Sequence, residues 1–524
     1  MLGNRFSQHS FAQIPDVKMA RSQFDRSFTI KDTVDFDYLV PFFVDFMYPG
    51  DTANVQANIF ARLATQKVPI MDNMMIDFFF FFVPCRLLWD NWEKFNGAQD
   101  DPGDSTDFVI PTITSTATTG EAVGSIWDKM GLPTEVDEIE VSALPFRAYN
   151  LIYNQWFRDQ NLQDSLVVNK DNGPDLPSEY ALVKRGKRHD YFTACLPEPQ
   201  KGDPVEIPFA SNTAAIQRVT GLGDAGLLWK ASNDTVAGDS DLRVSGGKMA
   251  NATDDVYYDP NGTLVAQLGL SQITVNALRS SIAVQSILEL DMRGGTRYVE
   301  ILQNHFNVIS PDFRLQRPEY LGGGQARINS HPVAQTAPTS GSNAQAQLAA
   351  FATASSSGGN IGFSKSFVEH GYVIGLMCAR ADITYQQGVE RHWSRSARFD
   401  FFWPKLQELG EQAVINKEIF CSGNSVTDGG VFGYQEQFGD LRYKPSLIKG
   451  EFRSTFATSL DYWHMAEEFA SLPSLNAAFI EQNTPIERAI AVTGAPHLLI
   501  DMWFKYNHAR PMMTYSVPST LGRF

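Results

Sequence analysis

The chain has 524 residues and a formal charge of −16, from 43 basic and 59 acidic side chains. It exceeds the roughly 250–300 residues at which a single hydrophobic core stops growing, so it forms several domains or one domain with long insertions. The acidic balance argues against a general nucleic-acid coat, because phosphate binding depends on clustered Lys and Arg. The 37 phenylalanines and the 43% hydrophobic fraction exclude a chain that is disordered throughout.

Residues 1–27 form a polar arm whose charge is opposite in sign to that of the whole chain, because its basic side chains outnumber Asp16 and Asp25. An arm without apolar periodicity has no core of its own, and neighbouring structure must order it. The arm lacks the apolar stretch of a signal peptide, and nothing downstream reaches about 18 continuous apolar residues. We therefore expect no membrane span and assembly in a cytoplasm.

Residues 28–84 predict strands separated by turn signals such as Tyr48–Asp51. The last of these strands is the most informative, because Phe78–Phe82 leave it no polar face. Such a strand must be covered on both sides, and Pro84 ends it because proline cannot donate to a sheet. Apolar residues at helical spacing then predict a short helix over 87–97.

Helical spacing recurs further along the chain. It predicts helices at 145–162, 277–292, 296–306 and 463–470. Short β-type runs dominate elsewhere, at 205–209, 263–268, 371–376, 397–403, 431–438, 452–457 and 498–506. Many short strands without alternating βαβ units favour a β-sandwich or barrel. The residues therefore predict a mainly β fold with helices in its long connections.

Two long segments differ from the rest in composition. Residues 211–270 hold seven Asp among Gly, Asn, Ser and Thr, whereas 328–364 contain no Asp, Glu, Lys or Arg. Long segments of this kind in compact domains are functional or disordered. Gly221–Gly226 spells GxGxxG, but the polar sequence after it does not predict the packed helix that a dinucleotide site needs.

No residue pattern nominates a catalytic, cofactor or metal site. The cysteines are far apart and predict reduced, partly buried thiols at Cys85, Cys195, Cys378 and Cys421. The nine histidines show no zinc-ligand spacing, and the Asp-rich segment lacks the EF-hand pattern. Lys184–His189 is the densest basic run; a solvated loop is its default interpretation, and contact with DNA or another subunit is the alternative.

Eight segments give the chain a resemblance to a known family. They are FDRSFT (Phe24–Thr29), PFFVDFMYPGDT (Pro41–Thr52), FFVPCRLLWDNWEKFNG (Phe81–Gly97), PFRAYNLIYNQWFRDQNL (Pro145–Leu162), RYVEILQNHFNV (Arg297–Val308), RPEYLGGG (Arg317–Gly324), DITYQQGVERHWSR (Asp382–Arg395) and LRYKPSLIKGEFRS (Leu441–Ser454). In this order they resemble the major capsid protein of microviruses (Microviridae), which are small single-stranded DNA bacteriophages. The resemblance is closest to the gokushovirus branch (Gokushovirinae).

The resemblance implies an eight-stranded viral jelly-roll β-sandwich over residues 28–524, with long inserted loops and several short helices. It also implies a T=1 icosahedral shell of about 60 copies around a single-stranded DNA genome, without a cofactor. The arm of residues 1–27 would then be internal and would place candidate DNA-facing side chains near the genome, namely Arg5, Lys18, Arg21 and Arg26. Packing of these charges against neighbouring protein is the alternative.

The implied partners are further copies of the chain, the packaged DNA, a small basic DNA-binding protein, a pilot protein, an internal scaffolding protein and a receptor on the bacterial host surface. The implied location is the virion, after assembly in the host cytoplasm. Gokushovirus capsid proteins carry an insertion that gathers at three-fold axes into a protrusion that meets the host. By position and composition the candidate is 211–270, with Trp229, Tyr257 and Tyr258 as host-recognition residues. The uncharged stretch 331–362 is the rival.

Two other classes of function stay open at this stage. A jelly-roll carbohydrate-binding protein or glycosidase would show an aromatic-lined groove with carboxylates about 5–9.5 Å apart. A nucleotide-dependent enzyme would use Gly221–Gly226. Neither explains a resemblance that extends over nearly the whole chain.

Overall fold

The computed structural model describes residues 21–203, 205, 275–293, 298–306, 316–334, 336, 348–356 and 360–515, together with six short strands between 215 and 267. The chain divides into two units, one formed by 1–199 with 295–524 and the other by 200–294. No described helix is both long enough and apolar enough to cross a membrane.

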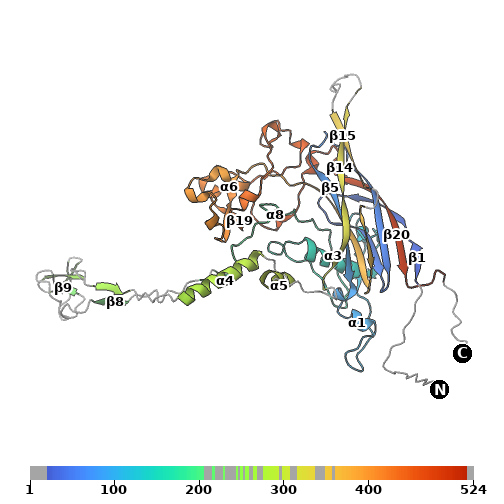
Figure 1. The fold of residues 1–524 in the computed structure, drawn as a ribbon, viewed down its shortest axis with the longest axis horizontal. Helices are drawn as coiled ribbons and strands as arrows, with labels where there is room; N and C mark the ends of the chain where they lie inside the picture. Colours follow the sequence, from blue (N-terminus) through green and yellow to red (C-terminus); the bar gives the residue numbers. More distant parts are fainter. Residues whose placement is uncertain are drawn as a thin grey trace, which may run out of the picture. The chain divides into compact units, whose positions relative to one another are not determined.

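The larger unit is built on a ten-stranded antiparallel sheet that curls into two halves (Figure 1). The first half contains β1 (Ser22–Asp25), β2 (Phe28–Val34), β4 (Thr52–Leu63), β15 (Leu348–Ser356), β16 (Gly362–Ser366) and β20 (Leu498–Arg510). The second half contains β3 (Val40–Met47), β5 (Met74–Pro84), β14 (Glu319–Ala334) and β17 (Gly371–Ala381). The strand order is β2–β20–β4–β15/β16 in the first half and β14–β5–β17–β3 in the second.

The ten strands occupy eight positions. β1 and β2 pair with successive parts of β20, and β15 and β16 pair with successive parts of β4. β1 and β2 therefore share one position, and β15 and β16 share another, which leaves four positions in each half. This arrangement confirms the mainly β, jelly-roll prediction.

The phenylalanine run lies in β5 and is covered on both faces, as the sequence predicted. Phe78, Phe80 and Phe82 point into the core between the two halves, whereas Phe81 points to the opposite side. The Phe80 ring lies 5.3 Å from that of Phe42, which in turn stacks at 5.9 Å on Phe504 of β20. The two halves are therefore joined by aromatic packing.

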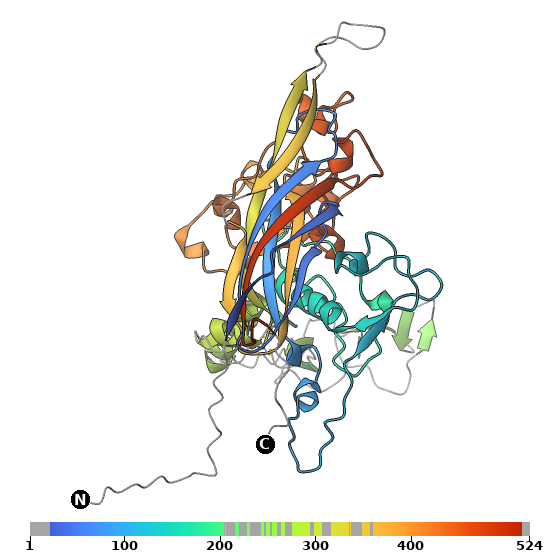
Figure 2. The same ribbon diagram turned by 90° about the vertical axis from the view of Figure 1, so that its right-hand side faces the viewer.

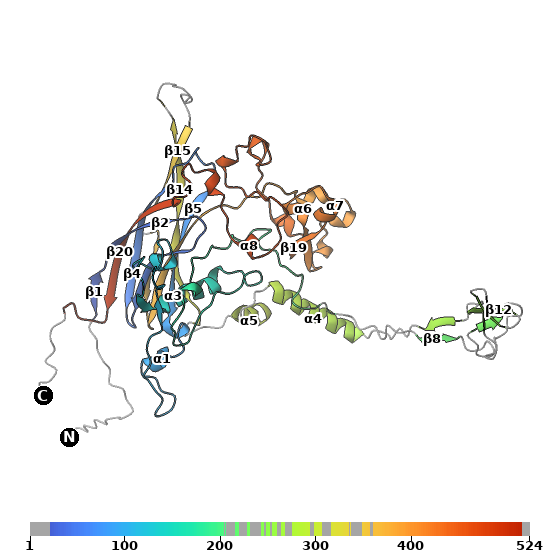
Figure 3. The same cartoon turned by 180° about the vertical axis from the view of Figure 1, so that it is seen from behind.

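Residues 85–183 form a cover layer over the outer face of the second half (Figure 3). Its elements are a 3-10 turn (Cys85–Leu87), α1 (Trp92–Phe95), β6 (Thr112–Thr114), α2 (Ile126–Lys129), β7 (Glu140–Ser142), α3 (Leu144–Ile152), a π turn (Tyr153–Phe157) and a 3-10 turn (Pro177–Glu179). The helix predicted over 145–162 is present as α3 and the π turn, although it ends earlier. The helix predicted over 87–97 is confined to α1.

Residues 383–490 fold around a smaller aromatic cluster that includes Phe192, Phe432 and Phe479. Its elements are β18 (Glu411–Ile415), α6 (Asn416–Ile419), α7 (Ser425–Asp428), β19 (Val431–Glu436) and α8 (Ala477–Ile480). Short 3-10 turns connect them at Arg391–Ser394, Arg398–Asp400, Pro404–Leu406, Gly439–Arg442, Gly450–Phe452, Asp461–Trp463 and Ile486–Arg488.

Three predicted elements are wrong in this region because polar groups near in sequence or far from it take up the backbone N–H groups. Instead of a strand at 397–403, Asp400 Oδ2 accepts hydrogen bonds from the N–H groups of Ser396 and Ala397. Instead of a strand at 452–457, the chain turns, and Ser454 N–H donates to a glutamine side chain. Instead of a helix at 463–470, the N–H groups of alternate residues donate to Asp72, Thr384 and Gln387.

The smaller unit, 200–294, contains the whole of the predicted insertion 211–270. Its strands are β8 (Ala215–Arg218), β9 (Leu228–Lys230), β10 (Arg243–Ser245), β11 (Lys248–Asn251), β12 (Asp254–Tyr258) and β13 (Leu264–Gln267). β8 pairs with β13, and the other four form a sheet in the order β10–β11–β12–β9. α4 (Val275–Arg293) follows, and α5 (Tyr298–Phe306) returns to the larger unit. Both helices were predicted, whereas Gly221–Gly226 and residues 206–209 lie outside the described residues.

Candidate functional site

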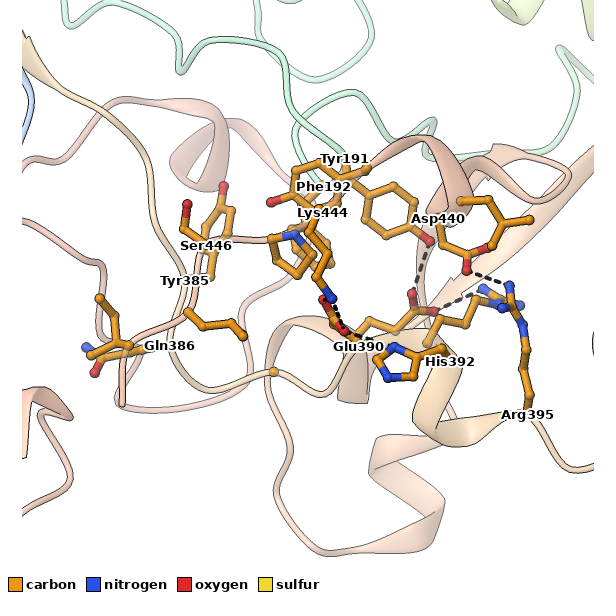
Figure 4. Close-up of a pocket in the computed structure, with 18 of the residues that line it drawn as sticks. Tyr191, Phe192, Tyr385, Gln386, Glu390, His392, Arg395, Asp440, Lys444 and Ser446 are labelled. Atoms are coloured by element: carbon orange, nitrogen blue, oxygen red, sulfur yellow. Dashed lines mark hydrogen bonds and ion pairs between the residues drawn. The ribbon is translucent and has the colours of Figure 1, made fainter. Parts of the chain in front are cut away.

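A pocket of about 270 Å³ opens between residues 191–192 and the 385–453 segment (Figure 4). One side is aromatic: Tyr191 stacks on Tyr443 with their centroids 5.4 Å apart, and Phe192 meets Tyr385 edge to face at 5.2 Å. The other side carries three carboxylates. Aromatic rings beside carboxylates are what the carbohydrate-binding and glycosidase alternatives require.

Each of these carboxylates already has a cation. Glu418 pairs with Arg391 at 3.0 Å, Asp440 pairs with Arg395 at 2.6 Å, and Lys444 reaches Glu390 (Figure 4). Tyr191 also donates its hydroxyl hydrogen to Glu418. The pocket therefore holds closed ion pairs, and none of its carboxylates is left without a counter-charge to act as an acid or base.

The pKa values in the pocket follow from burial. Burial raises the pKa of Glu418, and the charge of Arg391 only partly offsets that effect. Burial also raises the pKa of Tyr443 to about 12, so its phenol stays protonated at neutral pH. Within the described ranges, no group of three or more His, Cys, Asp or Glu side chains could hold a metal ion. The lining of the pocket therefore resembles a packed interior whose polar groups are held in ion pairs and hydrogen bonds.

The predicted DNA-facing residues divide between described and other parts of the chain. Arg5 and Lys18 lie outside the described residues. Arg21 is exposed and donates a hydrogen bond to Thr52 at the start of β4. Arg26 is half-buried and pairs with Asp45 at 2.5 Å, so its guanidinium also braces the roll. DNA contact by these four side chains stays a prediction.

The sequence did not predict a buried polar network that lies beside Arg26. His508 and Asp51 are fully buried and their polar atoms lie 3.1 Å apart, and Arg510 also reaches Asp51 at 3.1 Å. Burial and the neighbouring Arg510 lower the pKa of His508. No local sequence signal marks this network, because its members come from strands more than 450 residues apart.

The basic run Lys184–His189 is only partly solvated: Arg188 and His189 are exposed, whereas Arg185 and Lys187 form ion pairs within the fold. Arg185 pairs with Asp77 in β5, and Lys187 pairs with Glu467 at 2.8 Å. Asp77, Lys187 and Glu467 are nearly or fully buried, and Arg185 is partly buried. These pairs fasten the cover layer to the sheet and to the 383–490 region. Their partners lie more than 100 residues away in the sequence, so the run alone gave no sign of them.

The candidate host-recognition residues lie on paired strands of the smaller unit. The antiparallel register of β9 and β12 sets Tyr257 opposite Trp229 and Tyr258 opposite Leu228. Their side chains lie outside what the structure describes. The backbone therefore brings two of the three predicted positions together across one ladder.

Large aromatic side chains gather on the surface of residues 393–403, which we call the aromatic patch. Its exposed members are Trp393, Phe399, Phe401, Phe402 and Trp403. Trp393 is 76% exposed, and the Arg398 guanidinium lies over the Trp403 ring at 4.8 Å. Sequence reasoning missed the patch because it assigned residues 397–403 to a strand.

An eight-position antiparallel roll with long covering loops belongs to the jelly-roll class, which includes viral capsid domains and lectins. Comparison with known proteins identifies the family. The family described as "Capsid protein (F protein)" matches residues 12–520, and the chain belongs to it.

The chain is similar to three proteins named "Capsid protein VP1". It is 57% identical to that of Bdellovibrio phage phiMH2K, over 100% of both chains. It is 41% identical to that of Chlamydia phage 1, over 98% of this chain and 97% of the relative. It is 34% identical to that of Spiroplasma virus 4, over 92% of each. These are gokushovirus-type microviruses, so the resemblance seen in the sequence is confirmed.

Membership in this family settles the class of function. The chain is a microvirus major capsid protein and a component of the virion, and its role is structural rather than enzymatic.

Proposed function

We propose that about 60 copies of the chain close into a T=1 icosahedral shell around a single-stranded DNA genome. The aromatic patch carries this proposal. Exposed apolar patches rimmed by polar groups mark protein–protein contacts, and Trp, Tyr and Arg are the side chains that dominate the binding energy of such contacts. Trp393 and Trp403, with Arg398 between them, have this composition.

The charge of the chain adds a requirement for other partners. With a formal charge of −16 per copy, a shell of this protein repels a polyanionic genome unless counter-charge comes from elsewhere. We therefore include a small basic DNA-binding protein among the partners, and a pilot protein and an internal scaffolding protein during assembly in the host cytoplasm. Genome-filled, stable particles reconstituted from this chain and DNA alone would contradict the need for the basic protein.

The 200–294 unit supports the proposal of a three-fold protrusion that attaches to the host. The 19-residue α4 exposes apolar side chains around most of its circumference, among them Val275, Ile282 and Ile287. Exposed apolar side chains in this number on one element often mark a surface that another chain covers. Packing of three copies about a symmetry axis would cover these side chains.

The uncharged stretch 331–362, which includes the distal part of the β14–β15 hairpin, remains the rival for the protrusion. From His331–Ala334 and Leu348–Phe351 the two strands pair mainly with each other, and the ribbon exposes Val333 and Phe351. A two-stranded ribbon is marginal in water by itself, so a neighbouring chain is expected to support it. Deletion of 211–270 and, separately, of 337–347 in assembled particles decides between them. If the first deletion leaves cell binding unchanged, the assignment of 211–270 is wrong.

The shell itself is tested by the mass and shape of the assembled material. Wild-type chain is expected to give uniform round particles of about 3.5 MDa, which is about 60 copies of the 58.4 kDa chain. The double variant Trp393→Ala/Phe401→Ala is expected to stay as small oligomers with an unchanged circular dichroism spectrum. Val368→Ala, which truncates an equally exposed side chain away from the patch, is the matched control. Normal particles from the double variant, or only small oligomers from the wild type in every condition, including purification from an infected host, would overturn the proposal.

A further inference from the structure

The outer face of the first half of the roll has no cover among the described residues. In Figure 2 this half lies in front, with β20 in red and β2 and β4 in blue, and no described helix crosses it. Burial alternates residue by residue along β20 and β4, so every second side chain points outward. We call this surface, formed by the outward side chains of β2, β4 and β20, the open face.

Two aromatic rings lie at the centre of the open face. Trp503 is 44% exposed and Phe60 is 55% exposed. The register sets Trp503 opposite Asn58 and Asp501 opposite Phe60, so the two rings are diagonal neighbours. Neither ring packs against another ring or a cation within the described ranges, and the Trp503 indole N–H has no partner there. Part of each ring is therefore available to a ligand.

The charge of the open face is opposite to that of the chain. Its outward positions carry Lys31, Arg62 and Lys505 against a single carboxylate, Asp501. Lys31 pairs with Asp501 at 3.0 Å, whereas Arg62 and Lys505 form no ion pair with any described residue. At the two ends of β1, Arg21 and Asp25 add one cation and one carboxylate, which leaves the net charge of the face unchanged. On a chain with a net charge of −16, this is a local positive surface.

The remaining outward side chains are neutral hydrogen-bonding groups. Asn54, Gln56 and Asn58 follow one another along β4, and Asn507 lies opposite Asn54. Amide side chains can donate to and accept from base edges, which present both donors and acceptors. The open face thus differs from the aromatic patch, whose rings are clustered without such amides.

We infer that the open face binds single-stranded DNA. Bases stack on Trp503 and Phe60, the amides of β4 contact base edges, and Arg62 and Lys505 contact phosphates. Sequence-tolerant binding to single strands uses this combination of aromatic platforms and flanking cations. Arg21, one of the candidate DNA-facing residues, also lies beside this face, because it donates a hydrogen bond to Thr52 at the start of β4. The inference rests on the proposed enclosure of a DNA genome and adds which surface faces it.

The first test uses the purified full-length chain and a fluorescently labelled oligothymidylate. Trp503→Ala and Phe60→Ala are each expected to weaken binding about tenfold, as loss of one stacked base predicts. Lys505→Gln and Arg62→Gln are expected to reduce the slope of log affinity against log salt, which a purely structural role would not change. Trp393→Ala in the aromatic patch is the matched control and should leave affinity unchanged. Equal affinity for wild type and the Trp503 and Phe60 variants would overturn the inference.

The second test separates DNA from a neighbouring subunit as the occupant. Phe60→Cys is introduced together with Cys421→Ser, since Cys421 is the exposed cysteine and the other three are buried. Reaction of the thiol at position 60 is then compared in empty and DNA-filled particles. Protection in filled particles alone supports the inference. Protection in both assigns the face to a subunit contact, and protection in neither leaves it unoccupied; both outcomes overturn it. Failure of the wild type to form particles would count against the shell, while the oligonucleotide assay would still decide this inference.

Discussion

The two halves of the roll share one core but differ in what lies on their outer faces. In the second half, β5 and β17 are buried along nearly their whole length, because the cover layer packs on the face that the core leaves free. In the first half, β4 and β20 alternate between buried and exposed side chains. The same fold therefore contains strands with two dry faces and strands with one.

The difference is written in the strand sequences. A strand with two dry faces is apolar at consecutive positions, as in Phe78–Phe82, whereas a strand with one dry face alternates, as in Leu498–Arg510. Packing of the core does not require an aromatic ring at an exposed position of an alternating strand. Trp503 and Phe60 are such rings, and this is why we assign them to binding rather than to the fold.

The largest expected difference comes from placing a charge on each outer face. Ile374 of β17 is fully buried under the cover layer, and Ile374→Lys would leave an ammonium without a partner in apolar surroundings. We expect loss of the folded chain, because the penalty is comparable with the whole stability of a typical domain, about 5–15 kcal/mol. Leu499→Lys, at an outward position of β20, is the control and should fold normally by circular dichroism. A folded Ile374→Lys variant would show that the cover layer does not seal this face.

The second comparison removes one aromatic ring from the core between the two halves and one from the open face. Phe80 is fully buried between the halves and lies 5.1 Å from Phe363 of β16. Phe80→Ala is expected to reduce the free energy of unfolding by about 4 kcal/mol, through lost burial and the cavity left behind. Phe60→Ala on the open face should change it by less than about 0.5 kcal/mol. Urea denaturation followed by fluorescence measures both, and similar losses would contradict the assignment of the open face as uncovered.

How much of the fold the sequence predicts depends on how far apart in the chain the interacting residues are. The strand at 74–84 was predicted with both faces covered, because five consecutive phenylalanines leave no other arrangement. The helices at α3 and α4 were predicted from spacing that involves only local neighbours. Periodicity therefore identified the elements whose burial pattern repeats within a few residues.

Polar interactions between distant segments could not be predicted in the same way. Arg185 and Lys187 looked like solvated charges, yet their carboxylate partners are Asp77 and Glu467. The aromatic patch was predicted to be a strand, and the side chain of Asp400 captured the backbone there instead. In each case the deciding partner is either far away in the sequence or a short polar side chain whose hydrogen bond competes with the sheet.

The smallest expected difference concerns carboxylates on the two outer faces. Burial alone would raise the pKa of Asp77 under the cover layer, but hydrogen bonds and charges from Arg380 and Arg185 outweigh it and hold the pKa below its usual value. A depressed pKa contributes stability above the unfolded value, near 3.8, that is lost as pH falls through the lower folded value. Asp77→Asn should therefore cost about 3 kcal/mol at neutral pH, and its deficit against wild type should shrink in acid. Asp501→Asn breaks an exposed pair with Lys31 and should cost at most about 1 kcal/mol. Denaturation midpoints from pH 7 down to pH 3 test this, and a deficit for Asp77→Asn that stays constant with pH would show that the arginines do not set the charge state of Asp77.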